Sequence, residues 1–353
     1  MAASSTAVGR IVHVNGCAVA GVVSCLPGRQ IANAHFEQQF GETAVKDVVK
    51  MIGVESRYWT DQNTSTKDLC TKAGKHLLEQ LQWEPASVDA LIFVSQTPDY
   101  RLPATACSLQ VDLELDTACI AFDINLGCSG YPYALWLGMT MVQSGAARRV
   151  LLAVGDTVSK IVDPKDRSTA LLFGDAGTVT AIESSPKQRA TFVMGTDGRG
   201  AHNLIVPRGA FKDYSLCADP RLIDKTADCL YMDGGEIFNF TLKAVPELIN
   251  ETISASGFSL EAHDSFLLHQ ANMFMLKHLT KKSKISSEKA PINIDQYGNT
   301  SCASIPLLMT TSLKYRLSRE SMRLGLFGFG VGYSWAGASL SVGPLKCVET
   351  IQL

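Results

Sequence analysis

A cysteine between two glycines lies where a strand is expected to turn into a helix. Cys128 stands in Gly127-Cys-Ser-Gly130, after the apolar run 119–124 and before the amphipathic stretch 133–143. Glycines permit a sharp turn, and Pro132 suits the first turn of a helix. Because the N-terminal end of a helix favours a thiolate, we expect Cys128 to have a lowered pKa and to act as a nucleophile. The alternative is a structural cysteine, since free cysteines are usually buried.

Two further polar residues follow apolar runs in the second half of the chain. His269 comes after the predicted strand 266–268, and Asn299 comes after the predicted strand 292–294. Ligands of α/β proteins gather at the carboxyl ends of strands, so both side chains are candidates for a site there. Taken singly, His269 could be a structural histidine, and Asn299 could be a turn or capping residue.

Closely spaced glycines follow the predicted strand near Leu324, in Gly328-Phe-Gly330-Val-Gly332. They do not form a dinucleotide-binding fingerprint, because Tyr333 replaces the third glycine and no helix is expected after them. We expect instead that a backbone N–H of the segment Gly330, Val331 and Gly332 approaches a reacting oxygen. The sequence also lacks a Walker A segment, an H-E-x-x-H motif and an EF-hand loop, so neither metal nor nucleotide-phosphate chemistry is expected.

Short apolar runs separated by amphipathic stretches predict a mostly parallel α/β sheet. The predicted strands are 90–94, 119–124, 150–154, 177–182, 266–268, 292–294, 324–327 and 336–342. Similar runs recur in both parts of the chain, so we expect two like halves, 1–185 and 186–353, that meet at a polar turn in 183–189. Residues 195–232 are rich in Gly, Asp and Pro and predict an irregular, lid-like excursion.

Composition narrows the class of protein. The 353 residues carry 32 Lys and Arg against 34 Asp and Glu without a sustained basic block, which argues against nucleic acid as a partner. No segment offers the ~20 uninterrupted apolar residues of a membrane span, and the stretch 10–25 does not end in a signal-peptide cleavage site. The ten cysteines include no C-x-x-C pair and predict reduced thiols. We therefore expect a cytoplasmic protein with no membrane partner.

The motifs are more specific together than singly. Three of them occur in the order Gly127-Cys-Ser-Gly130, His269-Gln-Ala-Asn272 and Gly298-Asn-Thr-Ser301, with Asp163-Pro-Lys-Asp-Arg-Ser-Thr169 and Phe173-Gly-Asp-Ala-Gly177 between the first two. In this combination the chain resembles the β-ketoacyl-acyl-carrier-protein synthase III family over nearly its whole length. The resemblance implies an α/β thiolase-like fold, in which two similar βαβαβ halves pack in a layered αβαβα arrangement.

The resemblance also implies a decarboxylative Claisen condensation. Cys128 would accept the acyl group of an acyl-CoA, and His269 and Asn299 would hydrogen-bond the thioester oxygen of a malonyl unit as it loses carbon dioxide. The N–H groups of Cys128 and of the loop 330–332 would hold the tetrahedral oxyanion. The product would be a 3-oxoacyl thioester of fatty-acid or related secondary-metabolite synthesis. Coenzyme A and phosphopantetheine enter only as parts of the substrates, and no further cofactor is implied.

Substrate contacts and partners follow from the same resemblance. Arg167, Phe238 and Phe274 would contact the substrates. Leu102 matches the region with which each subunit of a family homodimer closes the acyl pocket of its neighbour. An acyl carrier protein would be the acidic partner. Lys277, Lys281, Lys282 and Lys284 could supply positive charge for it, or they could simply form a solvated helix end.

The chain departs from the family's usual pattern at three positions. Asp47 and Met51 stand where many members carry a Trp and an Arg that hold the adenine of coenzyme A. Phe274 stands where members often carry an Arg implicated in carrier contact. The departures leave open which thioester delivers the primer, so the primer class is not predicted.

Three alternatives differ from this condensation. A papain-like protease would share the order Cys, His, Asn, but its C-G-[SA]-C-[WY] segment is missing. An acyltransferase of similar build would pass the acyl group from Cys128 to an oxygen or nitrogen acceptor without releasing carbon dioxide. A non-catalytic thioester-binding protein would form no covalent adduct on Cys128.

Overall fold

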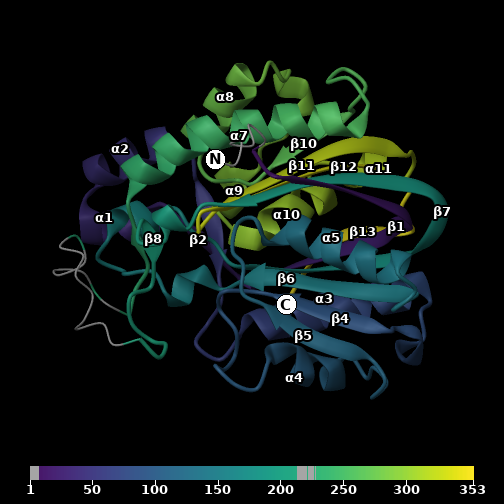
Figure 1. Ribbon diagram of the computed structural model, residues 1–353. Helices are drawn as coiled ribbons and strands as arrows, with labels where there is room; N and C mark the ends of the chain where they lie inside the picture. Colours follow the sequence, from purple (N-terminus) through teal and green to yellow (C-terminus); the bar gives the residue numbers. More distant parts are fainter. Residues whose placement is uncertain (1–7, 213–220, 222–225, 227) are drawn as a thin grey trace.

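A mixed sheet of nine strands organises the chain (Figure 1). The computed structural model describes residues 8–212, 221, 226 and 228–353. In the sheet the strand order is β10-β11-β12-β7-β6-β4-β5, and β1 pairs with both β7 and β13. The strands are β1 Arg10–Leu26, β4 Ala90–Val94, β5 Ile120–Ile124, β6 Arg149–Asp156, β7 Ala176–Thr196, β10 Ser265–Leu268, β11 Met322–Gly330, β12 Ser334–Val342 and β13 Cys347–Gln352. Short two-stranded ribbons are formed by β2 Arg29–Ala32 with β3 Ser56–Trp59 and by β8 Leu204–Ile205 with β9 Tyr231–Met232.

The sheet has two parts, one containing β10, β11 and β12 and the other containing β4, β5 and β6, and β1 and β7 run through both. Helices form three layers around these two parts. They are α1 Ala34–Phe40, α2 Glu42–Ile52, α3 Thr66–Leu81, α4 Thr105–Asp112, α5 Gly130–Gln143, α6 Arg167–Ala170, α7 Gly234–Ser256, α8 Met273–Lys282, α9 Ile294–Tyr297, α10 Ser304–Thr310 and α11 Lys314–Leu317. In Figure 1, α7 and α8 lie above the strands β10 to β12, and α5 and α10 lie between the two parts of the sheet. The third layer holds α3, which packs against β1, β6 and β7, and α4, which packs against β4 and β5. This is the predicted layered αβαβα arrangement, which is confirmed.

The central helix α5 explains why the layers hold together. Its sequence, GYPYALWLGMTMVQ, is apolar on nearly every face, which suits a helix surrounded by protein. It contacts β6 and β7 on one side and β11 and β12 on the other, and Tyr131, Leu135 and Met139 are fully buried. At ~25 cal/mol per Å² of apolar surface, such burial is the main favourable contribution to folding.

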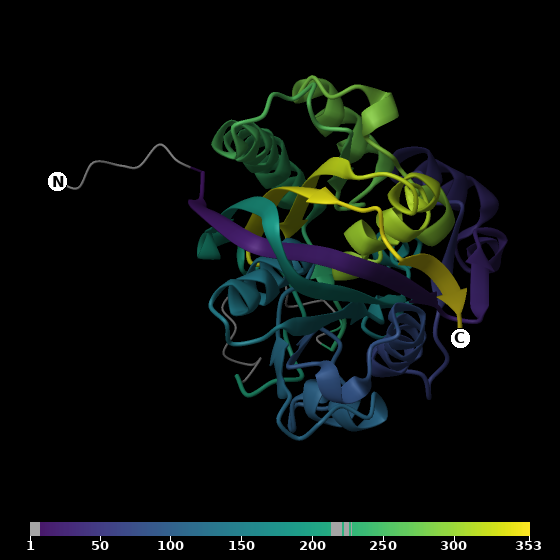
Figure 2. The same ribbon diagram turned by 90° about the vertical axis from the view of Figure 1, so that its right-hand side faces the viewer.

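The long strands β1 and β7 pair with each other along both parts of the sheet (Figure 2). Along β1, residues 10–15 pair with residues 189–194 of β7, and residues 17–25 pair with residues 177–184. On its other edge, β7 pairs with β6 up to Glu183 and with β12 from Thr191 onward. Residues 185–188 of β7 therefore stand opposite Gly16 alone, where the register shifts.

Three local predictions were wrong. The polar segment 183–189 is not a turn that ends a strand, because β7 continues through it as an exposed, irregular stretch. The expected strand 292–294 is irregular chain leading into α9, since a three-residue apolar alternation fits a helical start equally well. The sheet is also not mostly parallel: β6–β7, β11–β12, β7–β12 and β1–β7 are antiparallel pairs. The division into halves at residue 185 stays a prediction.

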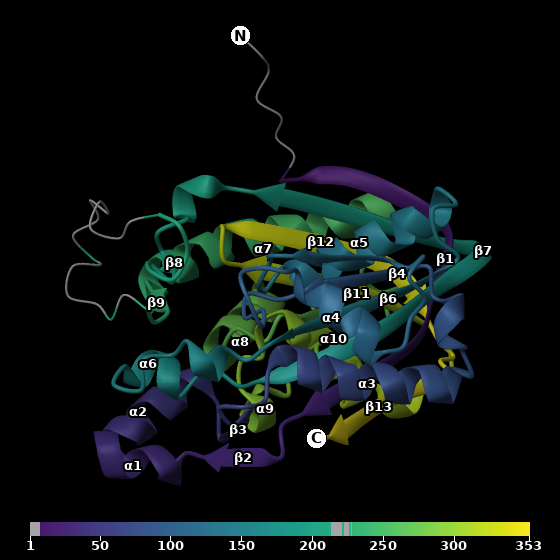
Figure 3. The same cartoon turned by 90° about the horizontal axis from the view of Figure 1, so that it is seen from below.

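The excursion predicted at 195–232 is described in part. Residues 213–220, 222–225 and 227 lie outside the described residues, and so does that part of the predicted lid. The rest forms a short 3-10 turn, Gly198–Gly200, and the ribbon of β8 and β9, which Figure 3 shows beside α6 and α7. Within the described ranges, no helix combines the length and apolar character needed to cross a bilayer.

Candidate active site

A cavity of about 640 Å³ reaches three of the predicted chemical groups. Cys128, His269 and Asn299 all line it, although they come from three segments far apart in the sequence. The predicted residues Arg167, Phe238, Phe274, Gly330 and Val331 line it as well. Gly332 and Leu102 are not among the residues that line it. The structure thus brings most of the predicted site together around one space.

Cys128 occupies the predicted turn between β5 and α5. The turn is closed by a hydrogen bond of 2.7 Å from the Gly130 N–H to the Gly127 carbonyl, and α5 begins at Gly130. The end of β11 packs directly against the thiol. A Cβ atom added at Gly330 would lie 2.9 Å from the Cys128 Cβ and 3.1 Å from its Sγ. Glycine at position 330 therefore leaves the room that the thiol occupies.

The structure does not give Cys128 the lowered pKa that its position before a helix predicts. Burial first, and the charge of Asp156 second, raise the pKa of the Cys128 thiol to about 12. Hydrogen bonds from the Ser301 side chain and from the N–H groups of Cys128 and Val331 act in the opposite direction. Desolvation of the thiolate outweighs these hydrogen bonds, so the pKa of the thiol stays above its ordinary value.

His269 lies just beyond the carboxyl end of β10, as predicted. Its backbone N–H donates to the Phe327 carbonyl at 2.8 Å, and its ring packs edge-on against Phe329 with centroids 5.6 Å apart. Burial lowers the pKa of the imidazole to about 3, so His269 is neutral at physiological pH. A neutral imidazole keeps one N–H hydrogen that it can donate.

The Ser304 hydroxyl is hydrogen-bonded to the Nδ1 side of the His269 ring. Its Oγ lies 2.8 Å from His269 Nδ1 and 2.9 Å from the Ser301 carbonyl, so its single hydrogen can go to either acceptor. When the hydroxyl donates to Nδ1, the imidazole hydrogen is on Nε2. When it donates to the carbonyl, Nδ1 carries the hydrogen instead.

Asn299 is held by pairing with a distant segment rather than by its own neighbours. Its N–H donates to the Leu172 carbonyl at 2.9 Å, and its carbonyl accepts from the Gly174 N–H at 3.1 Å. The preceding Gly298 has φ +67°, and a Cβ there would lie 2.7 Å from the Leu172 carbonyl oxygen. Only glycine meets both demands, so Gly298 lets the Asn299 backbone approach residues 172–174.

The side-chain amide of Asn299 is also oriented. Its Oδ1 accepts the Ser301 N–H at 2.9 Å, and its Nδ2 donates to the Ala271 carbonyl at 3.4 Å. An amide nitrogen has two hydrogens, so a second one remains for a group in the cavity. Asn299 is therefore arranged as a donor rather than as an acceptor.

Aromatic and apolar side chains form most of the rest of the wall. Phe238 of α7 and Phe274 of α8 stack with ring centroids 5.7 Å apart, and Phe274 is 52% exposed. Met51 of α2 also lines the cavity and is exposed. From the described part of the excursion, Leu204, Leu230 and Met232 line it. Leu102 is 77% exposed and lies away from this cavity within one chain.

Sequence reasoning missed the polar residues behind the three chemical groups. Asp156 is buried at the end of β6, where it accepts hydrogen bonds from Ser95 Oγ at 2.9 Å and from the Gln96 N–H at 2.7 Å. Ser301, inside a motif quoted above, contacts both Cys128 and Asp156. Asp156 sits at the carboxyl end of a predicted strand, and that position is the signal that could have found it.

Comparisons with known proteins agree with this geometry. Residues 122–198 and 253–342 match the family descriptions "3-Oxoacyl-[acyl-carrier-protein (ACP)] synthase III" and its C-terminal region. A β-ketoacyl-[acyl-carrier-protein] synthase III of Clostridium tetani is 35% identical over 89% of this chain and 94% of its own length. One of Caldanaerobacter subterraneus is 32% identical over 91% and 96%.

Solved structures extend the likeness to the whole fold. A 3-oxoacyl-(acyl-carrier protein) synthase of Burkholderia xenovorans LB400 has a TM-score of 0.97 and 60% identity, covering 98% of this chain and 99% of its own. A β-ketoacyl-[acyl-carrier-protein] synthase III of Thermus thermophilus has a TM-score of 0.81 and 34% identity, covering 92% and 99%.

The layered fold and the cysteine cavity define an acyltransferase with a thiolase-like fold. Within that class, the chain belongs to the 3-oxoacyl-[acyl-carrier-protein] synthase III family.

Proposed function

We propose that this chain condenses an acyl thioester with a malonyl thioester through an acyl-Cys128 intermediate and releases carbon dioxide. One observation carries the proposal: a single cavity of about 640 Å³ reaches the thiol of Cys128, the neutral imidazole of His269 and the amide of Asn299. These groups supply one nucleophile and two hydrogen-bond donors, which are the parts that a two-step acyl transfer and condensation requires.

In the first step, the Cys128 sulfur attacks the carbonyl carbon of the acyl thioester. A new carbon–sulfur bond forms, the bond to the donor sulfur breaks, and the thiol proton leaves with the departing thiol. The N–H groups of Cys128 and Val331 lie within hydrogen-bonding reach of the Cys128 sulfur, and they would donate to the oxyanion. Because His269 is a weak base with a pKa of about 3, we expect the proton to leave as the sulfur attacks rather than beforehand.

In the second step, the malonyl carboxylate leaves as carbon dioxide and its electron pair becomes an enolate. His269 Nε2–H and the free Asn299 N–H would donate to the thioester oxygen, where the negative charge collects. The tautomer with hydrogen on Nε2 is the one in which Ser304 donates to Nδ1. The enolate carbon then attacks the acyl carbonyl, the bond from that carbonyl to the Cys128 sulfur breaks, and the thiolate takes up a proton from solvent.

The walls of the cavity indicate the chemistry of the substrates. The apolar side chains of α2, α7 and α8 suit a hydrocarbon acyl group, and Arg167 offers a positive charge for a phosphate of coenzyme A or phosphopantetheine. Met51 and Phe274 give the wall apolar, exposed side chains where family members often place cationic ones. We therefore infer that the pantetheine arm and acyl chain contribute more to binding than the adenine of coenzyme A.

Intact mass spectrometry tests the proposal. Wild type and Cys128→Ala are incubated with a panel of acyl-CoA and acyl-carrier-protein thioesters and then with malonyl-CoA or malonyl carrier protein. We expect an adduct on the wild type alone, which malonyl donors discharge with release of carbon dioxide. An adduct that discharges onto oxygen or nitrogen acceptors without carbon dioxide would replace condensation by simple acyl transfer. No adduct from any thioester would overturn both.

We also propose that the protein works as a homodimer joined along β5. Among the described strands β5 ends the sheet order, and its residues are partly exposed where those of β4 are fully buried. Ile120 of β5 and Val111 of α4, the helix that packs against β5, are exposed apolar residues. Ultracentrifugation of wild type and Ile120→Lys tests this: we expect a dimer that dissociates more readily in the variant, and a monomeric wild type would refute it.

A further inference from the structure

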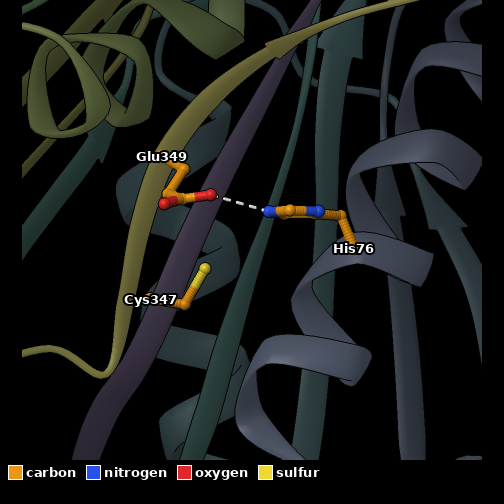
Figure 4. Close-up of side chains that lie close together, drawn as sticks. All are labelled: His76, Cys347 and Glu349. Atoms are coloured by element: carbon orange, nitrogen blue, oxygen red, sulfur yellow. Dashed lines mark hydrogen bonds and ion pairs between the residues drawn. The ribbon is translucent and has the colours of Figure 1, made fainter.

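Three side chains of types that bind metal ions lie together outside the cavity, between α3 and β13. Cys347 and Glu349 are two residues apart on β13, so they point to the same face of the strand. His76 of α3 faces them from the helix that packs over this part of the sheet. Figure 4 shows the three side chains converging from the two elements. The sequence could not indicate this group, since His76 and Glu349 are 273 residues apart.

The spacing of the three donor atoms suits a small cation. His76 Nε2 lies 2.7 Å from a Glu349 carboxylate oxygen, and the nitrogen, sulfur and oxygen atoms all lie within 4.8 Å of one another. Around a tetrahedral zinc ion with bonds of ~2.0–2.3 Å, donor atoms are roughly 3.5 Å apart. The histidine and carboxylate would separate by about 1 Å to admit the ion, which side-chain rotations of this size can supply.

We propose that His76, Cys347 and Glu349 form a zinc-binding site that joins α3 to β13. Imidazole, thiolate and carboxylate are the donors that zinc combines in proteins, whereas magnesium and calcium take oxygen donors. A water molecule would complete the tetrahedron. The site lies outside the substrate cavity and does not rest on the proposed condensation.

Burial and charge at the site agree with an ion of charge +2. Cys347 is 3% exposed, while the His76 and Glu349 side chains are 26% and 39% exposed, which leaves an entry path from solvent. A zinc ion supplies the positive charge that a thiolate and a carboxylate need at a half-buried position.

Binding is a ligand exchange without oxidation or reduction. The Cys347 S–H bond breaks, its proton goes to water, and a sulfur lone pair binds the ion. The hydrogen bond between His76 and Glu349 is replaced by one bond from each to zinc. One thiolate and one carboxylate balance the charge of the ion, so the half-buried site is neutral. The ion would tie the C-terminal strand, which pairs with β1, to the helix that covers β1.

Zinc uptake by the full-length chain tests the proposal. The experiment uses a Cys128→Ser background, so that a metal bound by the active-site thiol and His269 is not counted. After treatment with a chelator and dialysis, zinc is titrated and measured by calorimetry and elemental analysis. We expect saturable uptake of one ion per chain and a rise in Tm with zinc. Cobalt as a probe should give a thiolate-to-metal charge-transfer absorption band.

Variants of the three ligands make the test specific. Cys347→Ser should abolish the cobalt charge-transfer band, and Cys347→Ser, His76→Gln and Glu349→Gln should each weaken zinc binding about tenfold or more. Cys119→Ser is the matched control, because Cys119 is a half-exposed free thiol outside the group and should leave binding unchanged. Circular dichroism shows that each variant is folded. No saturable uptake, or uptake that is unchanged in Cys347→Ser and His76→Gln, would overturn the proposal.

Discussion

Cys128 and Asn299 line the same cavity but are positioned in different ways. Cys128 lies on a turn of consecutive residues between β5 and α5, and the neighbouring glycines of its own motif allow that turn. Asn299 is positioned by backbone hydrogen bonds to Leu172 and Gly174, more than a hundred residues earlier in the chain. The nucleophile thus depends mainly on local sequence, and the hydrogen-bond donor depends on contacts that only the complete fold provides.

The first prediction separates the two half-reactions. His269→Ala and Asn299→Ala should each slow malonyl decarboxylation by about 10²–10³-fold, because each removes one donor to the enolate oxygen. Acyl transfer to Cys128 should change much less, since neither group is assigned to the oxyanion of that step. Single-turnover acylation and carbon dioxide release measure the two steps. Equal losses in both steps, in folded variants, would contradict the assigned roles.

The second prediction concerns the Cys128 side of the comparison. Gly330→Ala would place a Cβ 3.1 Å from the Cys128 Sγ and displace the thiol, so acyl loading should fall by about 10²-fold. Malonyl decarboxylation should be largely retained, because His269 and Asn299 are untouched.

Gly198→Ala is the control for Gly330→Ala, since nothing lies within 4 Å of a Cβ at that position. Acyl loading is followed by intact mass against time for both variants. Normal loading in Gly330→Ala would show that the contact of β11 with the thiol is unimportant.

The third prediction concerns the Asn299 side. Gly298→Ala forces a side chain into φ +67° and against the Leu172 carbonyl, so it should cost about 1–3 kcal/mol of unfolding free energy and reduce decarboxylation about tenfold. Gly145→Ala is a matched control, because Gly145 has φ +79° with nothing within 4 Å of a Cβ. It should lose about 1 kcal/mol and keep its activity. Urea unfolding and carbon dioxide release measure both; equal effects of the two substitutions would remove the role given to the Leu172 contact.

The fourth prediction is a pH dependence of stability caused by His269. Burial lowers the pKa of this imidazole to about 3 in the folded chain, whereas an unfolded histidine titrates near 6.5. Between these values the unfolded chain binds the extra proton, so stability rises with pH and falls as the solution becomes more acidic. The slope that His269 adds is up to about 1.4 kcal/mol per pH unit.

His269→Asn should remove that part of the slope. Denaturant unfolding of wild type and variant at pH 7, 6 and 5 gives the difference, and the other groups that titrate, including the buried His263, contribute to both proteins alike. Parallel pH curves for the two proteins would mean that His269 is not held neutral by burial.

The chain's own sequence predicted one part of the site better than another. The Cys128 turn was predictable because an apolar run, two glycines and a proline occur within a few residues of one another. The pKa of that thiol was not, because it depends on how many distant atoms exclude water and on Asp156 of another strand. Local pattern gives the position of a group, and packing decides its protonation.

The position of Asn299 shows the opposite limit. The residue was identified through its motif, yet the strand expected before it at 292–294 is absent, and a short helix and Gly298 precede it instead. Its bridge to Phe173 is a single long-range pairing that no periodicity reveals. The layered fold was predictable from repeated apolar runs and from the family resemblance, whereas the passage of β7 through both parts of the sheet was not, since its polar residues 183–189 look like a turn.

The strands β1 and β7 belong to both parts of the sheet, and this affects how the protein unfolds. Residues 176–183 of β7 pair with β6, and residues 191–196 of β7 pair with β12. On the other edge of β7, β1 pairs with residues of both stretches. If one part of the sheet unfolds, the other part loses hydrogen bonds made by the same two strands. The protein should therefore unfold in one cooperative transition. A chain cut between the predicted halves would leave each fragment with half of a strand and an open edge, and the two fragments would fold only in each other's presence.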